Sequence, residues 1–306
     1  MAYIARRLLQ GCFSVFLLFT AVFFLIRLVP GDPAVIMAGP TAPPQTIEEI
    51  RVQFGFDRPF HEQYWLFLKN AVQGDFGVSI RSRLPVMTEI LTRLPHTMAL
   101  ALAGMAIAAI LGVGAGIFAA LRQNSKMDGV LTSVAVLAIS VPSFWLALLL
   151  MNFFSVKLGL LPPYGSGTWQ HFVMPSVVIG VAQVGLIMRV TRGSMIEVMS
   201  ADYIRTARAK GASRLRLLFN HALRGALVPL VTVIFLQIGV LLNGAVVTET
   251  VFNWPGIGRF LIESVLARDY PSIQALVLVF GIIFILINIL SDMLNAFVDP
   301  RLRRAR

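Results

Sequence analysis

Six long stretches without a charged side chain run through this chain of 306 residues, and they constrain its fold more than any other feature. Each stretch holds 17 to 28 residues, and a helix needs about 20 apolar residues to cross the roughly 30 Å of hydrocarbon in a bilayer. The sequence therefore predicts an all-α membrane protein with six transmembrane helices. The expected spans are residues 8–26, 97–121, 129–156, 172–188, 225–248 and 271–291.

The overall composition agrees with a membrane protein. Only 13% of the residues are charged, 57% are apolar, and the mean hydropathy is +0.78, whereas soluble domains carry about 25% charged residues. The net charge of +11 would suggest nucleic acid in a soluble protein. In a membrane chain we expect it to reflect orientation and contact with lipid, and we expect no nucleic-acid partner. A single cysteine, Cys12, excludes an intrachain disulfide.

The segments between the spans fall into two sets that alternate along the chain, and their basic residues differ in density. One set has 16 Lys and Arg residues in 65 positions, and the other has 10 in 107 positions. Because basic residues concentrate on the cytoplasmic side, both termini are expected in the cytoplasm. The cytoplasmic set is then 1–7, 122–128, 189–224 and 292–306, and the external set is 27–96, 157–171 and 249–270.

This orientation divides the chain into four regions. Residues 1–29 are a short tail and the first span, and residues 30–95 form an external segment. Turn signals and two expected amphipathic helices, at 46–54 and 59–72, indicate that this segment is a small ordered subdomain. Residues 96–296 are a core of five spans with a cytoplasmic loop at 189–224, and residues 297–306 are a cytoplasmic tail.

Motifs for enzymatic chemistry are absent from the sequence. There is no G-x-x-x-x-G-K-[ST] loop for ATP and no H-E-x-x-H for zinc. The chain is therefore expected to bind no cofactor or metal and to have no catalytic residue. The glycines of residues 112–116 lie inside a span, which favours close helix packing over a nucleotide loop. Pro142 is expected to kink the third span.

Polar residues within the spans are few, and three lie near the expected midplane: Gln183, Gln237 and Asn243. Buried polar groups in a bilayer face other helices or a pathway. Two interpretations stay open, namely hydrogen bonds between helices and the lining of a translocation path.

A basic segment at residues 201–224 interrupts the apolar sequence. Asp202 is expected to cap a helix of about two turns at 203–210, and Gly211 suits the left-handed residue that ends one. The helix is expected to present one face with an aromatic and small residues and another with basic ones. Such a capped, short helix fits a protein groove better than a lipid surface. The expected docking residues are Asp202, Tyr203, Ile204, Arg205, Thr206, Ala207, Arg208, Lys210 and Gly211.

This segment resembles the coupling loop of membrane permeases in binding-protein-dependent ABC importers. That loop reads E-A-A, three residues, G, nine residues and I-x-L-P; here Arg205-Thr206-Ala207 stands at E-A-A, and Gly211 matches the glycine. His221-Ala222-Leu223-Arg224 replaces I-x-L-P, and this departure is similar to the dipeptide, oligopeptide and nickel permease branch. Motifs in matching order elsewhere include Val29-Pro30-Gly31-Asp32-Pro33, Arg93-Leu94-Pro95-His96-Thr97, Phe252-Asn253-Trp254-Pro255-Gly256 and Asp299-Pro300-Arg301.

The resemblance implies a permease subunit of a bacterial inner-membrane importer for short peptides or glutathione, with nickel or another solute as the alternative. It implies a second homologous permease, two cytoplasmic ATPases that bind ATP and Mg²⁺, and a periplasmic or lipid-anchored solute-binding protein. The expected contacts with the binding protein are Arg58, Arg81, Asn253 and Trp254. A stand-alone channel or secondary carrier and an intramembrane enzyme remain alternatives, although the sequence shows neither an inverted repeat nor a nucleophile at membrane depth.

Overall fold

The computed structural model describes residues 2–27, 32–39 and 41–298. Within these ranges the chain is helical, and its only β-type pairing is a single bridge between Val78 and Pro85. The sequence motifs at 29–31 and 299–301 and most of the tail at 297–306 lie outside the described residues.

Five helices are long and apolar enough to cross a membrane. A bent pair, α6 and α7, makes a sixth span if the pair counts as one. The expected all-α architecture is therefore confirmed, and the fourth span extends past residue 188 to the end of α8. The long helices are α1 (Ala2–Arg27), α5 (Val86–Leu121), α8 (Trp169–Ser200), α11 (Leu223–Val251) and α13 (Tyr270–Val298).

The third predicted span is broken at Pro142, as the sequence indicated. Helix α6 (Lys126–Ser140) ends there, and α7 (Ser143–Leu150) with the π-helical turn η1 (Met151–Lys157) leaves at 99° to it. Proline has no backbone N–H, and the residue before it disfavours helical angles. Val141 accordingly takes the extended angles φ −76° and ψ 121°.

Helices α5 and α8 form the central pair of the bundle, and glycines allow their close approach. A Cβ on Gly112 would lie 2.9 Å from the Ile187 side chain, and one on Gly116 would lie 2.7 Å from the Met188 carbonyl oxygen. Larger residues would therefore push the helices apart. The expected packing role of residues 112–116 is confirmed for these two glycines, whereas Gly114 faces open space.

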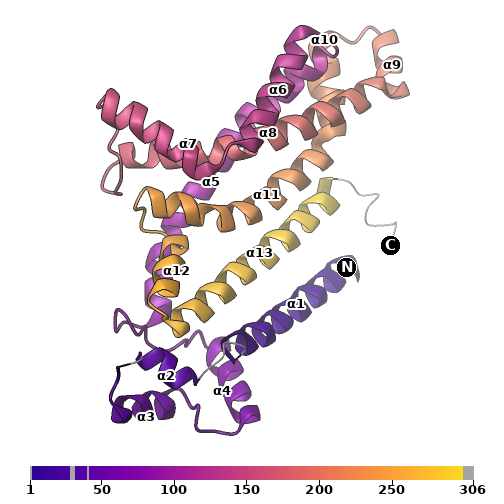
Figure 1. Cartoon of the computed structure of the whole chain (residues 1–306). Coiled ribbons are helices and arrows are strands. Elements are labelled where there is room, and N and C mark those ends of the chain that lie inside the picture. Colours follow the sequence, from indigo (N-terminus) through magenta and orange to yellow (C-terminus); the bar gives the residue numbers. More distant parts are fainter. Residues whose placement is uncertain (1, 28–31, 40, 299–306) are drawn as a thin grey trace.

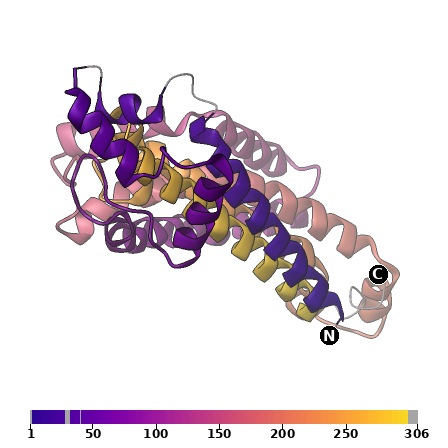
Figure 2. The ribbon, with the colours of Figure 1, turned by 90° about the horizontal axis from the view of Figure 1, so that it is seen from below.

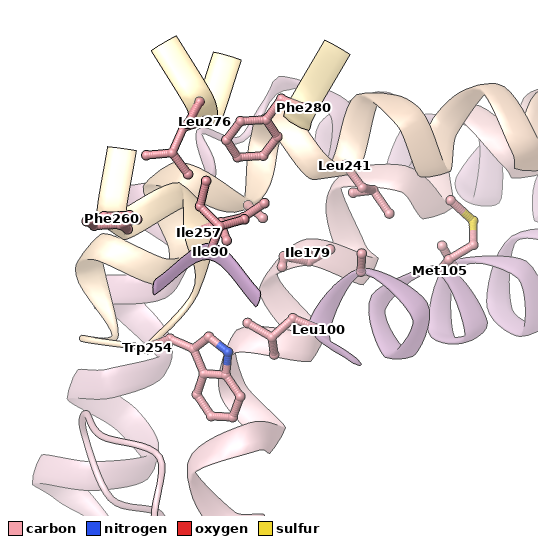
Figure 3. Packing of buried hydrophobic residues seen from close by; sticks show 14 of the residues in the cluster. Ile90, Leu100, Met105, Ile179, Leu241, Trp254, Ile257, Phe260, Leu276 and Phe280 are labelled. Carbon is pink, nitrogen blue, oxygen red and sulfur yellow. The ribbon is translucent and has the colours of Figure 1, made fainter. Parts of the chain in front are cut away.

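The largest apolar cluster joins α5, α8, α11 and α13 with the short helix α12 (Ile257–Leu266). Figure 3 shows how its side chains from these helices converge. The residues labelled there are Ile90, Leu100, Met105, Ile179, Leu241, Trp254, Ile257, Phe260, Leu276 and Phe280.

Three short helices form one end of the molecule: α2 (Pro33–Ala38), α3 (Pro44–Gln53) and α4 (Phe60–Val72). The last two confirm the amphipathic helices expected in the segment at 30–95. Phe23 of α1 attaches α4 to the bundle through ring contacts with Tyr64 and Phe67, at centroid distances of 5.0 and 5.6 Å. Figures 1 and 2 show α1 and α13 side by side. An ion pair of 3.2 Å between Arg7 and Asp292 joins them at the end away from α2–α4.

Candidate functional site

The first part of the basic segment folds as the short helix α9 (Asp202–Ala209), which stands at the end of the molecule opposite α2–α4 (Figure 1). The rest forms α10 (Arg214–Arg216) and the π-helical turn η2 (Leu217–Ala222), which leads into α11. The expected cap was wrong by one residue. Ala201 is the N-cap, with the extended angles φ −68° and ψ 148°, and no side chain caps the helix. Asp202 is the first residue of the helix, and its carboxylate is 97% exposed and lies 3.7 Å from Arg205.

The end of α9 agrees with the sequence. Gly211 has φ +82°, in the left-handed region that favours glycine. The Ala212 N–H donates to the Ala207 carbonyl at 3.2 Å, and the Gly211 N–H donates to the Arg208 carbonyl at 3.0 Å. These two bonds form a Schellman motif, which satisfies carbonyls that the last helical turn leaves free.

One side of α9 faces its own chain. Ile204 is 0% exposed, and it packs with Met195 of α8 and Ala226 of α11, while Ala207 is half-buried beside it. The expectation that Ile204 belongs to the docking face is therefore wrong, because its side chain anchors α9 to the bundle. The exposed residues are Asp202, Tyr203, Arg205, Thr206, Arg208, Ala209, Lys210 and Gly211.

The helices that carry α9 are tied to the bundle by an ion pair that the sequence analysis missed. The Arg192 guanidinium donates two hydrogen bonds, of 2.6 and 2.7 Å, to the Asp128 carboxylate. Asp128 also accepts from the Asn124 backbone N–H at 2.9 Å. An Arg–carboxylate pair with two hydrogen bonds fixes the relative orientation of the two side chains and also adds binding energy. The end of α8 is therefore held against the start of α6, close to the loop that carries α9.

Two of the three expected path residues meet about halfway along their helices. Gln183 and Gln237 are each the fifteenth residue of their helices, α8 and α11. The Gln237 Nε2 donates a hydrogen bond to the Gln183 Oε1, and both side chains are half-buried. The side chain of Asn243 lies outside the described part of the structure.

The expected contacts with a binding protein separate into surface and core residues. Arg58 and Asn253 are exposed, and the exposed Arg81 donates to Glu263 at 2.7 Å. Trp254 is only 5% exposed, and its indole N–H donates to the His96 carbonyl at 3.2 Å. The assignment of Trp254 to this surface is therefore wrong, because its side chain belongs to the core cluster.

A buried carboxylate that the sequence analysis did not single out fixes α12 to the bundle. Glu249 is 0% exposed; it accepts a hydrogen bond of 2.6 Å from the Thr97 hydroxyl and one of 3.0 Å from the Arg259 backbone N–H. The Thr97 oxygen in turn accepts from the Ile257 N–H at 2.9 Å. Glu249 lies in α11, one residue beyond the predicted span at 225–248. The network joins α5, α11 and the first turn of α12.

The sequence matches two family models that together cover nearly the whole chain. Residues 112–304 match the binding-protein-dependent transport system inner membrane component, and residues 1–101 match the N-terminal region of such membrane components. The glutathione transport system permease protein GsiC of Escherichia coli strain K12 is 46% identical over 301 residues, which cover 98% of each chain. The GsiC protein of Shigella dysenteriae serotype 1 is similar to the same extent.

The fold is similar to that of a solved transporter. Two inward-facing structures of the MetNI methionine ABC transporter align with TM-scores of 0.58 and 0.60, at 18% identity. Each alignment covers 70% of this chain and 97% of that one. The chain therefore belongs to the family of inner-membrane components of binding-protein-dependent transport systems, the permease subunits of ABC importers.

Proposed function

We propose that this permease carries short peptides, glutathione among them, across the inner membrane, and that ATP hydrolysis in partner subunits drives transport. The observation that carries this proposal is the 46% identity over 98% of both chains to a glutathione permease. The alternative within the family is nickel or another solute, and the likeness to GsiC favours glutathione over it.

The direct test is uptake by the complete complex in proteoliposomes, with its own binding protein and ATP supplied. Labelled glutathione, a tripeptide and a nickel chelate are compared at equal concentrations. We expect ATP-dependent uptake of glutathione or the tripeptide. Uptake of the nickel chelate alone would contradict the peptide assignment and support the alternative.

The exposed face of α9 is the proposed docking element for a partner ATPase. Three arguments support this role: the helix is ended by a Schellman motif, it is anchored by Ile204, and it presents basic side chains to solvent. A fixed helix can transmit force from the ATPase into α8 and α11, whereas a loose loop cannot. The exposed basic side chains are Arg205, Arg208 and Lys210. ATP and Mg²⁺ would bind in the partner.

The complete importer would contain two permease chains and two ATPases. ATP-driven closure of the ATPases would move the two α9 helices together, and the permease pair would then open to the other side of the membrane. In this arrangement α9 faces the cytoplasm, in agreement with the excess of basic residues in its segment.

The opposite end would receive the solute-binding protein, which is periplasmic or lipid-anchored. Arg58, Arg81 and Asn253 are exposed and belong to the segments expected outside the membrane, 27–96 and 249–270. Photocrosslinkers at these three positions should capture the binding protein during turnover, whereas one at the buried Trp254 should not. Capture at none of the exposed positions would contradict this placement.

A further inference from the structure

The Gln183–Gln237 pair holds free hydrogen-bonding groups about halfway along α8 and α11. A glutamine amide carries two N–H donors and an oxygen that accepts two bonds. The recorded bond uses one N–H of Gln237 and one acceptor site of Gln183. Among the described residues neither side chain makes another hydrogen bond, so both N–H groups of Gln183 are free, and so are the oxygen and the second N–H of Gln237.

The surroundings of the pair are apolar. The neighbouring Val184 and Ile238 pack against the main cluster, and so do Val233 and Ile234 one turn earlier in α11. Free amide groups in contact with hydrocarbon are strongly unfavourable. Because both side chains are half-exposed on the surface of this single chain, their free groups require a polar partner or water.

We infer that the two amides bind the backbone of the transported peptide; this inference rests on the proposed function. In an extended peptide, the N–H and C=O of one residue point to the same side, and a paired strand meets them with its own C=O and N–H. The oxygen of Gln237 can accept the solute N–H, and Gln183 can donate to the solute C=O. The pair thus offers one acceptor and one donor, as a residue of a neighbouring β-strand would.

This chemistry predicts the class of solute. A tripeptide has an inner residue that presents both an amide N–H and a C=O, and glutathione has one in its cysteine residue. The pair is uncharged and contacts no solute side chain in this arrangement, so it would accept many peptide sequences. A solute whose inner residue lacks the N–H should pass less readily.

The test compares an alanine tripeptide with its analogue N-methylated at the central residue, in proteoliposomes with saturating binding protein. We expect wild-type complex to transport the plain tripeptide faster, by about the 2- to 12-fold of one net hydrogen bond. Gln237→Leu removes the acceptor, so this ratio should be lower in the variant than in wild type by the same 2- to 12-fold factor. Because the binding protein is the same in both complexes, its own preference cancels. An unchanged ratio would overturn the inference.

A double variant separates solute binding from packing. If the glutamines only hold α8 to α11, Gln183→Leu with Gln237→Leu replaces both partners by apolar groups, and uptake should recover. Solute binding predicts that uptake stays low while ATPase subunits still co-purify. Thr232→Val is the matched control, because its hydroxyl bonds only within α11, to Val228 at 2.8 Å.

Three further results of these experiments are interpreted as follows. If the leucine variants lower the yield of complex, Gln237→Met, which is closer in volume, replaces Gln237→Leu in the ratio measurement. Recovery of uptake in the double variant would overturn the inference in favour of packing. Wild-type complex that moves no peptide, plain or methylated, would contradict the proposed function itself, whatever the variants do.

Discussion

Gly211 shows most directly how a single residue shapes α9, the proposed docking helix. A side chain at this position would meet nothing within 4 Å, so only the backbone angle of φ +82° opposes a substitution. Gly211→Val should cost about 1–3 kcal/mol through strain, shift the end of α9 and reduce solute-stimulated ATP hydrolysis. Gly193→Val is the control, since it also faces open space but lies in ordinary helix. Equal hydrolysis in both variants would contradict the role of this turn.

Arg208 distinguishes docking on protein from binding to lipid. Arg208→Glu should sharply lower the yield of co-purified ATPase, because breaking a buried charge pair at a protein contact costs about 2–5 kcal/mol. On an anionic lipid surface the loss of one basic residue costs only about 1 kcal/mol. Arg214→Glu reverses another exposed charge just outside α9, so lipid binding predicts similar small effects for the two variants. That result, with full ATPase yield in both, would count against docking.

In α9 the sequence predicted correctly those features that depend only on a residue and its neighbours along the chain. The left-handed angle of Gly211 follows from the absence of a Cβ and from its place after a helical run. The inward position of Ile204 could not be foreseen in the same way, because helical spacing groups residues on a face without saying which face meets the bundle. Likewise, the expected cap at Asp202 was one residue too late. Helical backbone angles begin at Asp202 itself, which makes Ala201 the N-cap. Alanine carries no capping side chain, so no sequence pattern marks this position.

Among the elements, α12 depends most on contacts between distant parts of the sequence. Thr97→Val keeps the side-chain shape but removes the hydroxyl that joins Glu249 to the Ile257 N–H. Each buried group left unpaired costs about 1–3 kcal/mol, so the unfolding temperature of the purified complex should fall. Thr92→Val is the control, since its hydroxyl is exposed and bonds only within α5. If both variants unfold at the wild-type temperature, the network does not stabilise α12.

The sequence predicted well those elements whose pattern of apolar and polar residues lies within one continuous segment. Uncharged stretches located the five long apolar helices and the bent pair of α6 and α7, and amphipathic patterns located α3 and α4. Helix α12 and the Glu249 network were missed, because Thr97 and Glu249 are 152 residues apart and no short pattern links them. Pro142 predicted the bend in the third span but not its 99°, which depends on how α7 packs against α8 and α11.

For the whole molecule, family membership replaces the alternatives of a stand-alone channel, a secondary carrier and an intramembrane enzyme. The two ends of the molecule carry different short helices. The three short helices α2–α4 lie at one end, and α9 lies at the other (Figure 1). The proposed function assigns the binding protein to the first end and the ATPase to the second, and exposed basic residues lie at the α9 end.

The orientation of these ends in the membrane gives the last prediction. Gln45 in α3 and Gln123 after α5 are exposed, and the membrane-spanning helix α5 separates them. With Cys12→Ala as background, a cysteine at position 45 should react with an impermeant thiol reagent in spheroplasts, while one at position 123 should react only after lysis. The reason is the higher density of basic residues in the segments expected to be cytoplasmic. Labelling of position 123 but not 45 in intact spheroplasts would reverse the orientation and would place α9 beyond the reach of any cytoplasmic ATPase.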